Sequence, residues 1–154
     1  MEKIKNFIQT NKKYSTDIVR IALSIVFLWF GINQLVNPES FLGYVPQWIY
    51  PHEPQMMHEH HFQFMHGIPN VQVHAIIMSN GAFETVFGIF LILGLFTRIA
   101  AFLLAFHLFG IAFSLGYNDV AVRDFGLALA TISLIFSGAG QLSLDNKLRK
   151  DKFL

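Results

Sequence analysis

The chain contains no cysteine and few charged residues. Without cysteine it forms no disulfide, no cysteine zinc site and no cysteine-ligated iron–sulfur cluster. Only 14% of its residues are charged, against about 25% in an average soluble domain, so charges are too few to cover a water-facing surface. The net charge of +1 also argues against a nucleic-acid partner, which needs cations to neutralise its phosphates. The shortage of charge points instead to an integral membrane protein.

Apolar residues make up 53% of the 154-residue chain, and they include 17 phenylalanines. A membrane-spanning helix needs about 20 mostly apolar residues, and four segments meet this requirement. They cover about 18–36, 74–96, 98–117 and 120–140, and a long connection over 37–70 separates the first two. We therefore predict an all-α fold, an integral membrane bundle of four antiparallel helices, built as a single domain over 1–154 with a long outer loop.

The first apolar segment also has the basic flank of a secretory signal peptide. No small-x-small cleavage site follows it, because the chain continues with the sequence Gly31-Ile32-Asn33-Gln34. We interpret the segment as a retained helix.

Basic residues fix the expected orientation in the membrane. With four spans, ten of the eleven lysines and arginines lie on one side: Lys3, Lys5, Lys12, Lys13, Arg20, Arg98, Lys147, Arg149, Lys150 and Lys152. Only Arg123 lies on the other side. Because cytoplasmic flanks carry the excess of positive charge, we expect a multi-pass protein of the cell membrane with both termini in the cytoplasm.

Small and polar residues recur at helical spacing in each segment and predict its inward face. The four predicted stripes are Arg20, Ser24, Gly31 and Gln34; Gly81, Glu84, Thr85 and Gly88; Ala100, His107, Gly110 and Ser114; and Gly126, Ala130, Ser133 and Ser137. At the cytoplasmic end we expect a polar layer of Arg20, Arg98, Gln141 and Asp145, and a cap on the third helix from Thr97.

Glu84 and His107 share a depth in the membrane. Each lies about 13–15 Å along its segment, at 1.5 Å per residue, and so near the bilayer midplane. An unpaired carboxylate is costly there, so Glu84 is either protonated or paired, with His107 as the nearest partner by depth. Two interpretations stay open: a catalytic proton relay, or a hydrogen bond that only joins two helices.

A second polar cluster is expected at the outer end of the bundle. It consists of Asn33, Gln34, Asn80, Arg123 and Asp124. As a functional site it would orient the headgroup of a quinone or lipid. As a structural feature, Asp124 would complement a helix dipole and Arg123 would extend toward headgroups.

The order of short motifs along the chain resembles that of the DoxX family of small four-helix membrane proteins. The matching motifs are Arg20 with Phe30-Gly31, Gly81-Ala82-Phe83-Glu84 with Gly88, Leu91-Ile92-Leu93-Gly94-Leu95, Thr97-Arg98, Arg123-Asp124, Gly138-Ala139-Gly140 and Leu142-Ser143-Leu144-Asp145. The family is named for a subunit linked to a terminal quinol oxidase and a thiosulfate:quinone oxidoreductase. The resemblance implies a quinone-linked redox role, with Glu84, Arg98, Arg123, Asp124 and Asp145 as the positions carried over.

The outer loop departs from this family pattern because it is rich in histidine and methionine. Imidazole and thioether donors together favour copper, and the candidate ligands are His58, His60, His61 and His66, with Met56, Met57 and Met65 nearby. Their spacing matches no rigid zinc motif. A solvated loop that titrates with outside pH, a docking site for a partner subunit, and axial ligation of haem are the alternatives.

Two functions of different classes follow. The first is a small subunit of a quinone-linked membrane oxidoreductase, at most one part of an enzyme, since the chain has no motif for an electron-carrying cofactor of its own. The second is a non-catalytic structural or copper-handling component of a larger complex. For both functions, the expected partners are the lipid bilayer and either other membrane subunits or a second copy of the chain. A proton-coupled transporter is disfavoured, because four spans without an inverted repeat are few for alternating access.

Overall fold

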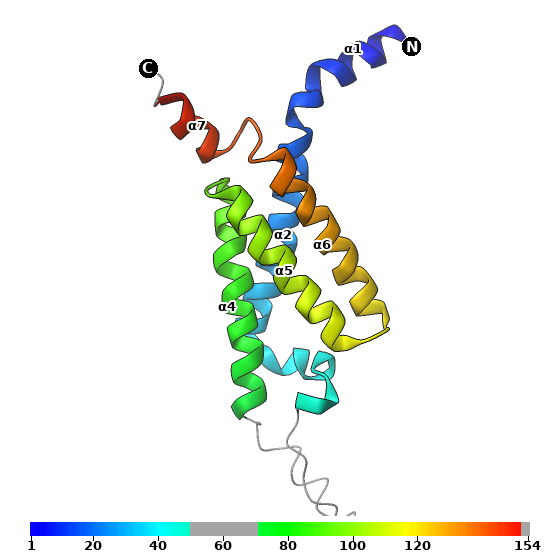
Figure 1. Ribbon diagram of the computed structural model, residues 1–154, viewed down its shortest axis with the longest axis vertical. Helices are drawn as coiled ribbons and strands as arrows, with labels where there is room; N and C mark the ends of the chain where they lie inside the picture. Colours follow the sequence, from blue (N-terminus) through cyan, green and yellow to red (C-terminus); the bar gives the residue numbers. More distant parts are fainter. Residues whose placement is uncertain (50–70, 152–154) are drawn as a thin grey trace, which may run out of the picture.

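The structure is a computed structural model that describes residues 1–49 and 71–151, and helices make up almost all of these two ranges (Figure 1). In chain order they are α1 (Glu2–Asn11), the 3₁₀ helix η1 (Lys12–Tyr14), α2 (Ser15–Val36), the 3₁₀ helices η2 (Pro38–Tyr44) and η3 (Gln47–Ile49), α4 (Val71–Leu93), α5 (Thr97–Leu115), α6 (Asp119–Ser137) and α7 (Leu144–Asp151). Four helices in the described ranges are long and apolar enough to cross a membrane, and they contain α2, α4, α5 and α6. The predicted all-α membrane bundle is confirmed.

The helix ends differ from the predicted ones by a few residues, and glycine explains the clearest case. The second span stops at Leu93 rather than at 96, because Gly94 adopts a left-handed φ of +65° that ends the helix. The predicted cap from Thr97 is wrong. Phe96 occupies the N-cap position of α5, and the carboxylate of Asp145 accepts hydrogen bonds from the backbone N–H groups of Phe96 (2.8 Å) and Thr97 (2.9 Å).

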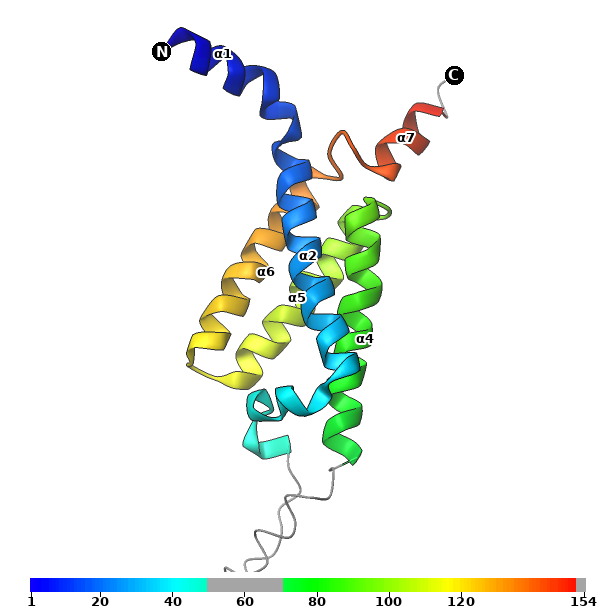
Figure 2. The ribbon, with the colours of Figure 1, turned by 180° about the vertical axis from the view of Figure 1, so that it is seen from behind.

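The four long helices form two pairs. Helix α2 packs along α4, and α5 packs along α6. The pairs meet where α2 begins and α6 ends, which we call the terminal end of the bundle, and they diverge toward the opposite end, which we call the loop end (Figures 1 and 2). Apolar side chains such as Leu23, Phe27, Leu91, Leu104 and Leu134 fill the space between the pairs. At the loop end, η2 and η3 lie across the opening.

Helices α2 and α4 touch backbone to backbone at two glycines. A Cβ atom added to Gly31 would lie 2.8 Å from the carbonyl oxygen of Gly81, and one added to Gly81 would lie 2.7 Å from the carbonyl oxygen of Gly31. No side chain fits at such distances. Small residues that allow this approach are the usual means by which membrane helices associate.

Replacing Gly81 with alanine should lower the free energy of unfolding by about 1–3 kcal/mol, because the added methyl group pushes α2 away from α4. The matched control is Gly126→Ala, since a Cβ atom there has nothing within 4 Å. The control should leave stability unchanged or slightly raised, as alanine is the better helix former. Denaturant unfolding in detergent micelles measures both values. Equal effects of the two substitutions would contradict the close contact.

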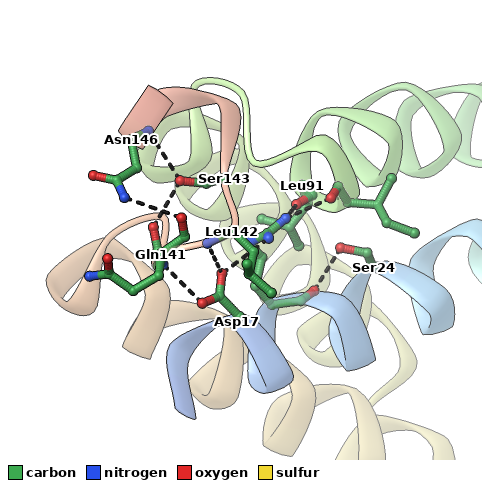
Figure 3. A network of polar contacts seen from close by, with 10 residues as sticks. Asp17, Ser24, Leu91, Gln141, Leu142, Ser143 and Asn146 are labelled. Atoms are coloured by element: carbon green, nitrogen blue, oxygen red, sulfur yellow. Dashed lines mark hydrogen bonds and ion pairs between the residues drawn. The ribbon is translucent and has the colours of Figure 1, made fainter. Parts of the chain in front are cut away.

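A network of polar groups holds the terminal end together (Figure 3). The Arg20 side chain is 1% exposed, and its Nη1 atom donates to the carbonyl oxygens of Leu91 (2.7 Å) and Ile92 (2.6 Å) at the end of α4. Its Nη2 atom lies 3.3 Å from Asp17 Oδ1. These contacts satisfy carbonyl groups at the helix end, where the Leu91 oxygen also accepts from the backbone N–H of Gly94 (3.1 Å).

The Asp17 carboxylate extends the same network to the end of α6. It accepts hydrogen bonds from the backbone N–H groups of Gln141 (2.9 Å) and Leu142 (3.1 Å). Gly140, with φ of +81°, packs so closely on this carboxylate that an added Cβ atom would overlap it. Arg20, Gln141 and Asp145 therefore lie in the predicted polar layer, although Gln141 acts through its backbone.

The predicted inward face of α6 is wrong. Gly126, Ser133 and Ser137 are exposed, and the buried face of α6 consists instead of Ala121, Asp124, Ala128, Thr131 and Leu134. The serine hydroxyls donate to carbonyl oxygens of their own helix, at 2.6 Å for Ser133 and 2.8 Å for Ser137. Because the helix satisfies them locally, these hydroxyls do not need to face another helix.

Candidate functional site

A cavity of about 630 Å³ lies between the two helix pairs, where they diverge toward the loop end. Apolar side chains form most of its wall, among them Phe27, Phe30, Phe83 and Phe106. Helices η2 and η3 and the two residues between them also contribute to it, through Phe41, Tyr44, Val45, Pro46 and Ile49. The polar side chains on the wall are Gln34, Asn80, Glu84, His107, Ser114, Arg123 and Asp124. A largely apolar cavity with a few converging polar groups is typical of a small-molecule site.

Glu84 is buried on the wall of this cavity, and two amide side chains hold it. Gln34 of α2 donates from Nε2 to Glu84 Oε2 (3.1 Å). Asn80, one turn before Glu84 on α4, donates to Gln34 Oε1 (2.7 Å) and lies 3.5 Å from Glu84 Oε1. The carboxyl group is therefore fixed by α2 and α4 together, while its Oε1 atom has only the long contact to Asn80 and a neighbour on α5.

That neighbour is His107. Its Nε2 atom lies 3.9 Å from Glu84 Oε1, too far for a hydrogen bond. The same Nε2 atom is buried and has no hydrogen-bond partner. The ring packs on Phe83, with 4.5 Å between ring centroids. The structure thus brings together the two residues that the sequence places at equal depth, and it leaves a buried nitrogen without a partner beside a carboxyl group.

Arg123 and Asp124 lie on the same cavity, one turn into α6 from the loop end. Arg123 Nε donates to Asp124 Oδ1 (2.9 Å), and its guanidinium group lies over the ring of Phe30, 4.7 Å from the centroid. Both residues interact electrostatically with Glu84. Asn33 lies apart from them, because its side chain donates to the carbonyl oxygen of Trp29 on its own helix (2.6 Å) and does not line the cavity.

The contribution of η2 to the cavity was not predicted. The aromatic run that begins at Phe41 includes Tyr44 and Trp48, and both are exposed. Phe41, Tyr44 and Val45, however, also line the cavity. Their spacing of three and four residues is the signal that could have shown one face of a short helix turned toward the bundle.

The predicted copper ligands His58, His60, His61 and His66 lie outside the residues that the structure describes. Within residues 1–49 and 71–151, no three histidine, aspartate or glutamate side chains are grouped in a way that could hold a metal ion.

Comparison with known proteins shows to which family the chain belongs. No curated protein and no solved structure matches the chain. A family model described as the TQO small subunit DoxD matches residues 15–153, a range that includes all four long helices and the polar cluster of the cavity. The resemblance to DoxX-like membrane proteins is thereby confirmed. The chain, a multi-pass membrane protein, belongs to the family of the TQO small subunit DoxD.

Proposed function

We propose that the chain is the small membrane subunit of a quinone-linked oxidoreductase complex and that the cavity between its helix pairs binds the quinone. The family supports the coarser part of this proposal, a membrane subunit of an oxidoreductase. The observation that carries the finer part is the buried Nε2 atom of His107, which has no partner and lies next to Glu84 on the wall of an apolar cavity.

The residues of the cavity fit the chemistry of a quinone. A quinone has a flat apolar ring with two carbonyl oxygens, and the aromatic side chains Phe30 and Phe83 offer surfaces for such a ring. The guanidinium group of Arg123 is a donor suited to one oxygen, and His107 Nε2 can donate to the other once a small ring movement turns this buried atom to the cavity. The volume of about 630 Å³ lies within the range of about 300–1,000 Å³ that is usual for small-molecule sites.

Reduction of a quinone consumes two electrons and two protons, so its site needs groups that deliver protons. Glu84 and His107 are neighbouring titratable groups on the wall, and one bridging water or a small ring movement closes their 3.9 Å separation. Gln34 and Asn80 keep the carboxyl group in place without exchanging protons themselves. In this proposal Glu84 receives a proton at Oε1 and passes it toward His107.

The electrons must come from another subunit. The chain has no cysteine to hold an iron–sulfur cluster and no motif for another redox group. We therefore propose that a partner subunit carries the electrons to the cavity. The chain would contribute the binding site and the proton path.

We further propose that the terminal end faces the cytoplasm. Of the lysines and arginines that the structure describes, all except Arg123 lie on α1, η1, α7 or the ends of helices at the terminal end. This asymmetry follows the positive-inside rule. The cavity then lies in the outer half of the membrane.

Quantifying what the protein retains on purification tests the proposal. The chain is purified in mild detergent together with its partners, extracted with organic solvent and assayed for quinone, and a second sample is assayed for metals. We expect about one quinone for each copy of the chain. Stoichiometric copper without quinone would favour the metal-handling alternative, through the histidine-rich segment. Neither quinone nor metal would favour a purely structural subunit, in which Glu84 and Gln34 only join two helices.

A further inference from the structure

A second cavity lies at the terminal end, far along the bundle from the first. Its volume is also about 630 Å³, and η1, the starts of α2 and α5, the end of α6 and α7 line it. Three basic side chains from three different elements line it, Lys13, Arg98 and Arg149. The hydroxyl residues Thr16 and Ser137 lie on the same wall. The proposed function assigns no role to this cavity, although Arg98 and Asp145 on its wall are among the positions that the family resemblance carries over.

The described acidic side chains leave the positive charge of this cavity unbalanced. Among the described residues, Asp145 is the one acidic residue on its wall, and its carboxylate already accepts two backbone hydrogen bonds at the start of α5. The Arg98 side chain makes no hydrogen bond or ion pair with any residue in the described part of the chain. Arg149 has a single long contact, 3.3 Å to Asn146 Oδ1. Three cations beside one engaged carboxylate leave the cavity suited to an anion.

The rim of the cavity is apolar on one side. Phe96 and Ile99 belong to its lining, and each is 59% exposed on the outer surface of the bundle. Both lie at the end of a membrane-spanning helix, where headgroups and acyl chains meet. A ligand that fits here has an anionic head for the basic side and hydrocarbon for the apolar side. A soluble phosphate would leave Phe96 and Ile99 without a partner.

We infer that this cavity binds the phosphate group of an anionic phospholipid. The guanidinium groups of Arg98 and Arg149 match phosphate oxygens in pairs, while Lys13 supplies a point charge. The short helices α1 and α7 flank the site and leave the bundle in diverging directions (Figures 1 and 2). Both carry lysines, and both expose apolar side chains, including Ile4 and Phe7 on α1 and Leu148 on α7, as helices that lie in a membrane interface do.

Binding of short-chain lipids to the purified protein tests this site. The probes are dihexanoyl phosphatidylglycerol, dihexanoyl phosphatidylcholine and inorganic phosphate, each titrated below its micelle-forming concentration where it has one. The double variant R98Q/K13Q removes two cations of the cavity. The matched control K12Q/K147Q removes the same charge from two exposed residues at the same end that do not line the cavity.

We expect wild-type protein to bind phosphatidylglycerol more tightly than phosphatidylcholine, and R98Q/K13Q to bind phosphatidylglycerol about 10- to 30-fold more weakly, since each cation near an anionic lipid is worth about fivefold. The control should weaken binding by less than about threefold. Equal losses in both double variants would overturn the site in favour of diffuse surface charge. Binding of inorganic phosphate as tight as that of the lipid would also overturn it. Quinone retention is expected to be unchanged in both variants, so this test is independent of the proposed function.

Discussion

Replacing Glu84 with glutamine should lower quinone-linked turnover of the complex by about 100-fold or more, while the bundle stays folded. Glutamine has nearly the shape of glutamate and can still accept the hydrogen bond from Gln34, so the contact between α2 and α4 persists. It cannot carry a proton, so it would cut the path toward His107 that we propose. Turnover is measured as quinone reduction by the purified complex, with thiosulfate, the donor that the resemblance implies.

The control for this experiment is Glu39→Gln. Glu39 is exposed on η2 and does not line the cavity, so its substitution should change turnover by less than about twofold. Stability is measured alongside, because a purely structural Glu84 predicts the opposite pattern. Unchanged turnover with a lowered melting temperature in Glu84→Gln would show that the residue only joins the helices.

Replacing Arg20 with alanine should lower the free energy of unfolding by about 3–5 kcal/mol, the usual cost of removing one partner from a buried charge network. The change leaves the Asp17 carboxylate buried beside backbone N–H groups alone, and it removes the donor to Leu91 and Ile92 at the end of α4. We expect much less protein to accumulate in the membrane and a lower denaturant midpoint in micelles.

Two further variants separate this network from a general effect of arginine. Arg98→Ala removes an exposed arginine with no ion pair in the described part of the chain, and it should cost less than about 0.5 kcal/mol in lipid-free micelles. Arg20→Lys keeps the charge but loses the planar fork that reaches two carbonyl oxygens, so its cost should lie between the two. Similar costs for Arg20→Ala and Arg98→Ala would contradict the network.

The sequence predicts the spanning helices well because length and hydropathy alone decide them. It predicts the inward faces of α2 and α4, since Gly31 and Gly81 are required where backbones touch and Glu84 must avoid lipid. The same reasoning fails on α6, where serine hydroxyls bond to their own helix. Small size shows that a residue can face inward, not that it must.

The network at the terminal end was only partly predictable. Arg20, Gln141 and Asp145 are visible as polar residues at one membrane boundary, but Asp17 is one residue before the predicted span and is not part of the predicted polar layer. Its partner Gln141 is 124 positions away along the chain. No local pattern gives such a contact. The caps of α4 and α5 depend on side chains from distant segments, and this explains why the local prediction for Thr97 failed.

The candidate site, like this network, was only partly predictable from the sequence. Depth in the membrane placed Glu84 opposite His107, because rise per residue is fixed in a helix. The cavity itself depends on the angle between the two helix pairs and on η2 lying across the opening. Neither of these can be read from spacing, so the sequence indicated the polar groups but not the space they line.

Blocking the cavity from Gly110 tests the central claim most directly. Gly110 lines the cavity, and a Cβ atom added there has nothing within 4 Å, so phenylalanine can enter the space without displacing the backbone. Gly126 is equally open but lies on the outer surface of α6, away from the cavity. Gly110→Phe and Gly126→Phe therefore add the same ring to two open positions in the membrane.

The measurement is the amount of quinone bound per chain at equilibrium in the two purified variants. If the quinone occupies this cavity, Gly110→Phe should lower the affinity by about tenfold or more through steric overlap, while Gly126→Phe binds like the wild type. Equal quinone binding by wild-type protein and both variants would contradict the proposal that this cavity is the quinone site.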